Sequence, residues 1–405
     1  MKGSTFLVTG GAGFIGSRLV HRLRKANARV IVLDALTYAG HLENLRPWID
    51  PTPVFLPTFG ETIRRVPIVL DDSTWQVSPV FLPWPWHKVG SHRVERIQTP
   101  DALRDQIRNA LSTHGLAFVW ADILSQTILT TLVAEVDGIF HLAAETHVDR
   151  SILSPEPFWR TDLWGTFTLL ESLRHIANAS KKVPRLLHVS TDEVYGEVLE
   201  GAVTEDAPFH PSSPYAAAKA AADRLVTTYV RTYGLPALIV RPSNIFGPYQ
   251  HPEKFIPQII IRALQHQPLP IYGDGQQRRT WLYVEDAADA LLFLWEHGVE
   301  GEAYNLAGPD ELPNLTVAEK ILTLLKRSKD LIQFVEDRPG HDRRYAMQTH
   351  KIEALGWQPK TRFDEGLTRT VQWYQDHTSW WQTLWKENQE FWNRWYHPRI
   401  RTPFP

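Results

Sequence analysis

The chain has 405 residues and a formal net charge of −2, so it lacks the broad basic surface that binds nucleic acid or anionic membranes. It contains no cysteine, which excludes disulfides, thiolate catalysis and cysteine-bound metals, and we expect no metal site. Hydrophobic residues make up 43% of the chain and charged residues 22%, as in a globular protein with a buried core. Neither a secretion signal nor an apolar run of membrane-spanning length is found. We therefore expect a cytoplasmic protein without membrane or nucleic-acid partners.

A glycine-rich turn lies between the first predicted strand and the first predicted helix. Residues 5–9 are apolar, and residues 17–25 have the spacing of an amphipathic helix. Between them, Gly10, Gly13 and Gly16 permit a tight turn and a close approach of backbone to a pyrophosphate, whose charge the helix N-terminus attracts. Because the turn has a strand before it and a helix after it, the pattern predicts a dinucleotide site rather than a flexible loop.

The second predicted strand, residues 29–33, is followed by Asp34. A carboxylate at this distance from the glycines hydrogen-bonds the ribose 2′-hydroxyl of NAD and repels the 2′-phosphate of NADP. The next residues, Ala35, Leu36 and Thr37, include no arginine that would hold such a phosphate. The pattern favours NAD, although an ordinary turn aspartate is the alternative interpretation of Asp34.

The segment from Leu45 to His114 interrupts this pattern, because the next predicted strand is residues 117–123 and a compact βαβ unit needs no such connection. Its landmarks are two copies of PVFLP at residues 53–57 and 79–83, Trp48, Trp75, Trp84 and Trp86, and a predicted helix over residues 99–111. We expect an inserted subdomain or flap over about residues 46–114. It either packs on its own aromatic side chains or forms an oligomer contact or a lid over the substrate.

Strands and helices alternate in the next part of the chain. The predicted strands are residues 117–123, 138–144, 186–189 and 237–241, and the predicted helices are residues 125–134, 158–177 and 214–233. Alternation with right-handed crossovers predicts an α/β, Rossmann-like, doubly wound parallel sheet. We expect an NAD-binding domain over residues 1–247 and, over residues 248–405, a smaller α/β substrate lobe with some segments returning to the core.

Tryptophans recur at helical spacing near the C-terminus, at Trp380, Trp381, Trp385 and Trp392. Such a pattern predicts packing between helices rather than a ligand site.

The densest group of reactive side chains follows the predicted strand at residues 186–189. Thr191, Asp192 and Glu193 come at its carboxyl end, the edge at which open α/β sheets bind ligands. Tyr215 and Lys219 are four residues apart in an alanine-rich segment, so a helix presents them on one face. A nearby cation stabilises a phenolate, which makes the pair a candidate acid–base site.

Taken together, these motifs resemble the extended short-chain dehydrogenase/reductase superfamily, and within it the NAD-dependent sugar-nucleotide 4,6-dehydratases of the dTDP-glucose type. The segments that carry the likeness are TGGAGFIGS, DALTYAG, ADI, HLAAETHVDRS, STDEVYGE, SPYAAAK, RPSNIFGPYQHPEKFIP, YGDGQQRRTWLYVED and DRPGHDRRY. It covers nearly the whole chain except residues 45–114. The Thr-Asp-Glu triplet is the specific part, because related epimerases and decarboxylases generally lack the Asp-Glu pair.

The resemblance implies a lyase reaction on a nucleoside-diphosphate hexose, with dTDP-glucose expected first. The sugar is oxidised at C4, loses water across C5 and C6, and regains the hydride at C6. Tyr215, helped by Lys219 and Thr191, takes the proton of the 4-hydroxyl. Glu193 removes the C5 proton, and Asp192 protonates the departing 6-hydroxyl.

The resemblance also implies binding residues and a homodimer joined through the helices at residues 158–177 and 214–233. For the cofactor they are Gly10, Gly13, Phe14, Ile15, Gly16, Asp34, Ala35, Leu36, Thr37, Asp122, Ile123, Leu142, Ala143, Ala144, Thr161, Tyr215 and Lys219. For the substrate they are Thr146, Asn244, Lys254, Phe255, Pro270, Ile271, Tyr272, Arg279, Asn314, Arg338 and His341.

Three positions depart from the family pattern: Asp162, Ile245 and Thr280 stand where Asn, Asn and Asp are usual. They leave the nucleotide base, thymine or uracil, and the sugar open. The alternatives are a 4-epimerase or UDP-glucuronate decarboxylase of the same superfamily and, more remotely, a non-catalytic NAD-sensing protein.

Overall fold

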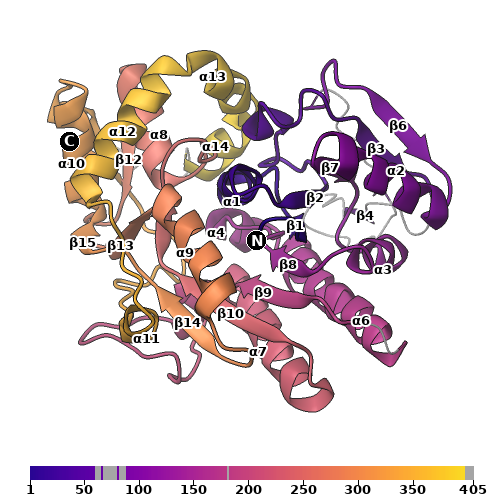
Figure 1. The fold of residues 1–405 in the computed structure, drawn as a ribbon. Coiled ribbons are helices and arrows are strands. Elements are labelled where there is room, and N and C mark those ends of the chain that lie inside the picture. The colour runs from indigo at the N-terminus through magenta and orange to yellow at the C-terminus, as the bar shows by residue number, and fades with distance from the viewer. Residues whose placement is uncertain (60–64, 67–79, 82–87, 180–181, 397–405) are drawn as a thin grey trace.

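The computed structural model describes residues 1–59, 65–66, 80–81, 88–179 and 182–396. Within these residues a nine-stranded sheet in the order β14-β10-β9-β8-β1-β2-β7-β3-β6 forms the centre of the molecule, and all of its strand pairs are parallel (Figure 1). The strands are β1 Thr5–Thr9, β2 Arg29–Asp34, β3 Val54–Pro57, β6 Val94–Ile97, β7 Leu116–Trp120, β8 Gly138–His141, β9 Arg185–Val189, β10 Ala237–Pro242 and β14 Ala303–Leu306. The prediction of a doubly wound parallel sheet is confirmed.

The strand order reverses at β1. From β1 the chain adds β2 and β7 on one side, and β8, β9 and β10 on the other. In such sheets a crevice opens at the carboxyl ends of the strands on either side of the reversal, here β1 and β8. The glycine turn and the end of β8 therefore meet at this edge.

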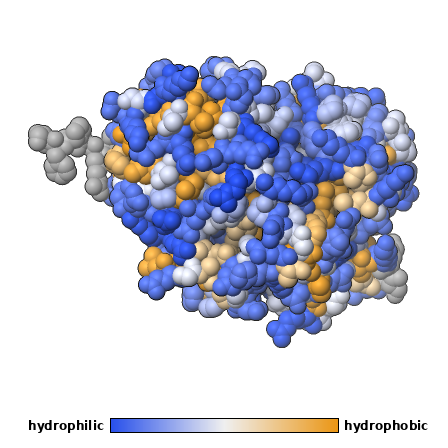
Figure 2. Space-filling model, turned by 60° about the vertical axis from the view of Figure 1, so that its left-hand side comes forward, coloured by the Kyte–Doolittle hydropathy of each residue, from blue (hydrophilic) through white to orange (hydrophobic). Residues whose placement is uncertain are grey.

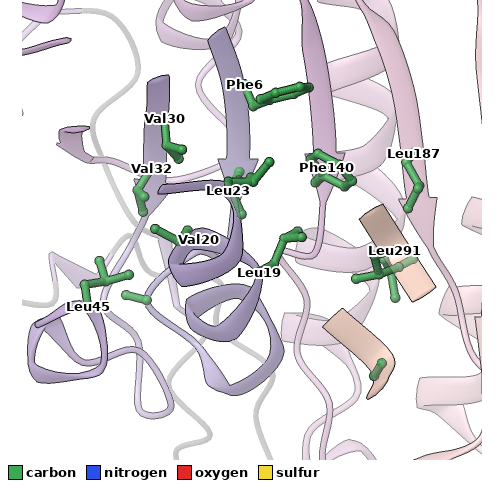
Figure 3. Close-up of a cluster of buried hydrophobic side chains, with 14 of the residues drawn as sticks. Phe6, Leu19, Val20, Leu23, Val30, Val32, Leu45, Phe140, Leu187 and Leu291 are labelled. Carbon is green, nitrogen blue, oxygen red and sulfur yellow. The ribbon is translucent and has the colours of Figure 1, made fainter. Parts of the chain in front are cut away.

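Helices cover both faces of the sheet. One face packs against α1 (Phe14–Lys25) and α9 (Val284–His297), and the other against α2 (Pro100–Thr113), α3 (Gln126–Val133), α6 (Gly165–Asn178) and α7 (Pro214–Tyr233). Successive strand residues point to opposite faces, so Phe6 belongs to the same apolar cluster as Leu19 of α1 (Figure 3), whereas Leu7 belongs to the cluster on the other face. Each buried side chain of this size contributes roughly 1.5–3 kcal/mol, so the strands and the helices that cover them together stabilise the core.

Most of the described part of residues 46–114 extends the central sheet beyond β7 instead of forming a separate subdomain or flap. Val54–Pro57 and Val94–Ile97 are strands β3 and β6 of the central sheet, and β3 pairs with β7. Helix α2 covers them through Leu103 and Ile107. The first PVFLP copy is thus largely a buried strand, because β7 and β6 pair with it on both sides and α2 covers it.

Only part of the second PVFLP copy is described: Val80–Phe81 forms β5, paired with β4 (Arg65–Val66). Residues 60–64, 67–79 and 82–87, including Trp75, Trp84 and Trp86, lie outside the described residues.

Several predicted boundaries differ from the structure. The strand expected at residues 117–123 is Leu116–Trp120, and the strand expected at 138–144 ends at His141. In both cases the chain leaves the ladder where it turns into the crevice. The helix expected at residues 158–177 begins with a short α5 (Glu156–Phe158) and a π-helical stretch, Trp159–Trp164, before α6. Helix α7 has the predicted bounds.

The second half of the chain adds smaller sheets and helices. Its strands are β11 Asn244–Phe246, β13 Arg278–Tyr283 and β15 Asp310–Pro313 in one sheet, and β12 Leu269–Tyr272 with β16 Ile332–Val335 in another. Its helices are α8 Phe255–Leu264, α10 Asn314–Leu324, α11 His350–Ala354, α12 Phe363–Asp376, α13 Thr378–Glu387 and α14 Gln389–Tyr396.

The C-terminal tryptophans pack between helices, as predicted. Trp381, Trp385 and Trp392 are buried in the apolar cluster of this half, and Trp380 packs against it.

The face shown in Figure 2 is mostly hydrophilic, and its hydrophobic residues lie in separate patches. None of the helices in the described residues has both the length and the apolar character of a membrane span. Within the same residues, no group of three or more histidine or carboxylate side chains is arranged to hold a metal ion.

Candidate active site

A cavity of about 290 Å³ lies at the crevice, and the glycine turn forms part of its wall. Gly10 has a φ of 70°, and an added Cβ would lie 2.8 Å from the backbone nitrogen of Ala143. A Cβ on Gly16 would lie 2.2 Å from the carbonyl oxygen of Gly10. The turn therefore requires glycine at both positions, and it leaves room for a ligand to approach the backbone.

Asp34 ends β2 on the cavity wall. Its carboxylate accepts hydrogen bonds from the backbone N–H groups of Ala12 (2.9 Å) and Leu36 (2.8 Å), which fix its position beside the glycine turn. Ala35 and Thr37 also line the cavity. Leu36 does not line the cavity: its side chain is fully buried in the core, at a residue with a φ of 49°.

The other predicted cofactor residues all line this cavity: Gly10, Gly13, Phe14, Ile15, Gly16, Asp122, Ile123, Leu142, Ala143, Ala144, Thr161, Tyr215 and Lys219. The small side chains of Ala143 and Ala144 lie beside the glycine turn, where larger ones would narrow the crevice. The crevice combines a turn that requires glycine at two positions, a helix N-terminus and a fixed carboxylate. These features fit a dinucleotide with an unphosphorylated 2′-hydroxyl.

All five predicted catalytic residues reach the same cavity: Thr191, Asp192, Glu193, Tyr215 and Lys219. The first three leave β9 in a short helical turn, Asp192–Tyr195, which Thr191 caps by accepting a hydrogen bond from the N–H of Glu193 at 3.3 Å. Lys219 approaches from α7, where its ammonium donates to the carbonyl of Val189 at 2.7 Å. Two elements distant in sequence thus form one site.

Burial raises the pKa of both neighbouring carboxyl groups. The pKa of Asp192 rises to about 7 because the side chain is buried and because Glu193 lies beside it. The pKa of Glu193 is also raised by burial, but the positive charges of Arg338, Arg279 and Lys254 oppose that rise. The two groups therefore differ in environment, which suits one to be an acid and the other a base.

The phenol of Tyr215 does not show the expected lowering of its pKa. Burial, followed by the negative charge of Glu193, raises the pKa of Tyr215 well above its usual value, while a hydrogen bond with Thr191 opposes the rise. Burial lowers the pKa of Lys219, and the nearby carboxyl of Asp162 opposes that change. In this structure desolvation outweighs the stabilisation of the phenolate that the sequence predicts.

The predicted substrate residues fall into two groups. Thr146, Asn244 and Lys254 line the cavity, and the Lys254 ammonium donates to the backbone carbonyl of Thr146. The remaining ones do not line it: Phe255 begins α8, Pro270, Ile271 and Tyr272 lie in β12, Arg279 in β13, Asn314 at the start of α10, and Arg338 and His341 in the loop after β16.

Three of the second group nevertheless belong to a network next to the carboxylates. Arg338 lies 3.3 Å from Asp149, whose other oxygen accepts a hydrogen bond of 2.7 Å from the Tyr272 hydroxyl. Arg338 and Arg279 also stabilise the charge of Glu193. The second half of the chain therefore places two cations, Arg338 and Arg279, where their charge acts on Glu193.

Three other arginines in the second half of the chain form ion pairs with carboxylates. Arg278 and Arg344 both pair with Glu311, and Arg343 pairs with Asp274 at 2.6 Å.

Several cavity residues were not predicted: Leu33, Ala39, Gly40, Ala121, Glu145, Val189, Ser190, Pro242, Ser243, Ile245, Gln250, His251 and Glu253. Glu253 is buried and its carboxylate accepts from the Arg150 side chain at 2.8 Å. Both residues lie in motifs that carry the family resemblance. The charged residues of those motifs could therefore have been predicted as residues of the cavity.

Comparisons with known proteins agree with this geometry. A family model described as GDP-mannose 4,6 dehydratase matches residues 89–370, and one described as NAD dependent epimerase/dehydratase family matches residues 6–67. The chain is 40% identical to the dTDP-glucose 4,6-dehydratase of Neisseria meningitidis serogroup B, over 93% of this chain and 95% of that protein. It is 38% identical to the dTDP-glucose 4,6-dehydratase of Escherichia coli, over 93% and 95% of the two chains.

Solved structures show the same likeness. The dTDP-glucose 4,6-dehydratase DesIV from Streptomyces venezuelae, crystallised with NAD, has a TM-score of 0.75 and 37% identity, covering 94% of this chain and 99% of that chain. A UDP-glucose 4-epimerase from Thermus thermophilus, in complex with NAD, has a TM-score of 0.70 and 26% identity over 92% and 99% of the two chains.

Proposed function

The chain belongs to the nucleotide-sugar 4,6-dehydratases of the NAD-dependent epimerase/dehydratase family, and on that premise we propose that it converts dTDP-glucose to the 4-keto-6-deoxy sugar nucleotide. The observation that carries the proposal is the meeting of the Asp192–Glu193 pair with Tyr215 and Lys219 in one cavity. A Tyr/Lys pair serves an oxidation, but an adjacent acid and base serve an elimination as well. The enzyme is a hydro-lyase.

The cofactor is NAD, held by the glycine turn, Asp34 and the cavity-lining residues given above. When bound, it supplies the hydride acceptor for oxidation at C4 and the hydride donor for reduction at C6. Asp34 would accept a hydrogen bond from the ribose hydroxyl, and the N-terminus of α1 would attract the negative charge of the pyrophosphate. Tyr215 and Lys219 line the same space, so cofactor and sugar share one compartment.

The oxidising half of the site consists of Tyr215, Thr191 and Lys219. Tyr215 acts in its phenolate form, which accepts the proton of the sugar 4-hydroxyl, and the hydrogen bond with Thr191 favours that form. Lys219 lies one helical turn after Tyr215 on α7, is held by the carbonyl of Val189, and its positive charge favours the phenolate. A bound substrate excludes water, so this charge acts at low effective dielectric.

The eliminating half is the adjacent carboxyl pair. Oxidation at C4 acidifies the proton at C5, and Glu193, kept more easily ionised by Arg338 and Arg279, removes it. Asp192 has a pKa of about 7, so about half of the molecules carry its proton at neutral pH, and that protonated form donates to the departing 6-hydroxyl. Water leaves, and the net redox change is zero.

Incubation of the purified protein with dTDP-glucose, with UDP-glucose in parallel, tests this function. We expect a product that has lost one water and carries a 4-keto group, seen by mass spectrometry and by reduction with borodeuteride. A product epimerised at C4 with its 6-hydroxyl retained would instead assign the chain to the epimerases. A preference for UDP-glucose would reject the thymine base.

We infer a homodimer, formed through the exposed side of the π-helical stretch, α6 and α7. Trp164 is 59% exposed, Tyr233 is 49% exposed and Trp159 is 42% exposed. Large exposed aromatic side chains on neighbouring helices favour a partner surface, and a second copy of the chain would bury them. Light scattering measures the mass, and Trp164→Glu is expected to shift it toward the monomer.

We further propose that the protein acts in the cytoplasm and that residues 1–247 serve NAD while residues 248–405 mainly serve the substrate. The position of the two buried arginines in the second half supports this division. Fractionation of the producing cells tests the location, and substitutions confined to one half, read by NAD affinity and by substrate KM, test the division.

A further inference from the structure

The last two described helices, α13 and α14, contact both the cofactor half and the substrate half of the molecule; residues 378–396 are here called the C-terminal clasp. In Figure 1 the clasp lies between α1 on one side and α8 and α12 on the other. Trp380 of α13 and Trp395 of α14 each use the indole N–H for a contact that leads toward the active site.

The first contact leads to the buried arginine beside Glu193. The indole N–H of Trp395 donates to the Tyr272 hydroxyl at 2.5 Å, and that hydroxyl donates to Asp149 at 2.7 Å. The second oxygen of Asp149 lies 3.3 Å from a guanidinium nitrogen of Arg338. A continuous polar chain therefore runs from the clasp to Arg338, which stabilises the charge of Glu193.

The residues of this hydrogen-bonded series are largely buried, so the loss of one hydrogen bond affects the others. The side chains of Arg338 and Asp149 are 10% and 8% exposed, so water does not substitute for a lost partner as it does at a surface. The ring of Tyr272 is also enclosed by Tyr396 of the clasp, at 5.8 Å, and by His341, at 5.6 Å. Tyr272 is thus oriented by the clasp rather than by solvent.

The second contact leads to the glycine turn. The indole N–H of Trp380 donates to the side-chain oxygen of Asn44 at 3.1 Å, and the Asn44 amide donates to the carbonyl of Ala12 at 2.9 Å. Ala12 lies inside the turn, and its own N–H donates to Asp34. Trp380 therefore supports the part of the wall that receives the cofactor.

We propose that Trp395 and Trp380 are positioning residues: Trp395 orients Arg338 through Tyr272 and Asp149, and Trp380 orients the glycine turn through Asn44. The clasp then fixes the distance between the two binding regions across the cavity. The role of Trp395, here called the substrate arm of the clasp, rests on the proposed function. The role of Trp380, here called the cofactor arm, requires only that the protein binds NAD.

The chain offers a matched control in Trp392. It lies on α14, is buried against Trp385, and its indole nitrogen has no hydrogen-bond partner among the described residues. Trp392→Phe removes the same ring volume as Trp395→Phe without breaking a polar chain. A change seen in both variants reflects the loss of ring packing. A change seen only in Trp395→Phe reflects the loss of the hydrogen bond that orients Tyr272.

The test measures substrate KM, kcat, NAD affinity and melting temperature for Trp395→Phe, Trp380→Phe and Trp392→Phe. We expect Trp395→Phe to raise the KM for dTDP-glucose about three- to tenfold, the range of one net hydrogen bond, with NAD affinity unchanged. Trp380→Phe is expected to weaken NAD binding by a similar factor, with a smaller effect on KM. Trp392→Phe is expected to change only the melting temperature.

A double-mutant cycle adds a readout that a purely structural role does not produce. If Trp395 acts through Tyr272, the double variant Trp395→Phe/Tyr272→Phe raises KM no more than the larger single change does. Should Trp395→Phe fail to fold, Tyr272→Phe interrupts the same chain and must raise KM by itself. Additive effects, or equal effects of Trp395→Phe and Trp392→Phe on KM, would overturn the inference.

Failure of the proposed function is separable from failure of this inference. Wild-type protein that gives no 4-keto product refutes the function. The Trp380→Phe comparison still reads NAD affinity in that case, and unchanged affinity would refute the cofactor arm of the clasp.

Discussion

The ammonium of Lys219 donates a hydrogen bond to the carbonyl oxygen of Val189, 2.7 Å away. Val189 ends β9, and the next residues lead directly into the Thr191–Glu193 triplet, whereas Lys219 lies one helical turn after Tyr215 on α7. This contact therefore ties the helix of the oxidising pair to the strand of the eliminating pair. It sets the distance between the two halves of the site.

Lys219→Met is expected to slow the oxidation at C4 by about 10²-fold or more, because a positioned acid–base system typically contributes this much. Methionine fills the buried space without a charge, so the fold should persist. Single-turnover absorbance of the reduced cofactor measures the step. Lys320→Met, which removes a lysine paired with Asp364 at the surface, serves as the control. An unchanged oxidation rate in Lys219→Met would reject its role.

Glu193→Gln is expected to oxidise the sugar at C4 but to form the final product about 10²- to 10⁴-fold more slowly, since the C5 proton has no base. Reduced cofactor should accumulate, and exchange of the C5 hydrogen with deuterated solvent should be lost. If product formation continues at the wild-type rate, Glu193 is not the base.

The elimination step is expected to slow as pH rises above about 7. Asp192 must carry a proton to act as the acid, and burial together with Glu193 raises its pKa to about 7. The proton is present below that value and is lost as pH rises through it. Product formation measured against pH in single-turnover experiments gives the profile, and Asp192→Asn should be slow at every pH without this decline.

Asp34→Ser is expected to weaken NAD binding by roughly 1.5–3 kcal/mol, the contribution of a hydrogen bond to a charged group. The same change removes the repulsion that excludes a 2′-phosphate, so the preference for NAD over NADP should fall. Calorimetric titration of both cofactors measures the ratio. A preference that stays at the wild-type level would show that another residue selects the cofactor.

Asp223→Asn is expected to destabilise the fold by about 3–5 kcal/mol, because it leaves the guanidinium of Arg241 buried without its counter-charge. The two side chains are 0% and 2% exposed and share two hydrogen bonds of 2.8 and 2.9 Å. Denaturant unfolding measures the loss. The double variant Asp223→Leu/Arg241→Met removes both charges and should be less destabilised than Asp223→Asn.

The local patterns of this chain were sufficient for its parallel sheet and for most of its cofactor site. An apolar strand, a glycine turn and a helix are consecutive in sequence, so short-range geometry determines how Gly10, Gly16 and the start of α1 meet a ligand. Family motifs supplied the rest of the cofactor residues. Leu36 alone among the predicted cofactor residues does not line the cavity, since its side chain is buried in the core.

The same patterns were misleading for residues 46–114, where β3 and β6 join the central sheet. The pairing of β3 with β7 joins residues that are far apart in the chain. The hydrophobic periodicity of a strand does not show which sheet the strand will join.

By itself the sequence determined the identities and order of the reactive groups: a glycine turn, Asp34, the Thr191–Glu193 triplet, and Tyr215 with Lys219 one helical turn apart. The tertiary structure alone decided that burial raises the pKa values of Asp192 and Tyr215 and that the charges of Arg338 and Arg279 act on Glu193. It also decided that the clasp contacts Asn44 in one half of the chain and Tyr272 in the other. The physical reason is that desolvation and long-range charge depend on what surrounds a group in space. Neighbours in space come from distant parts of the chain.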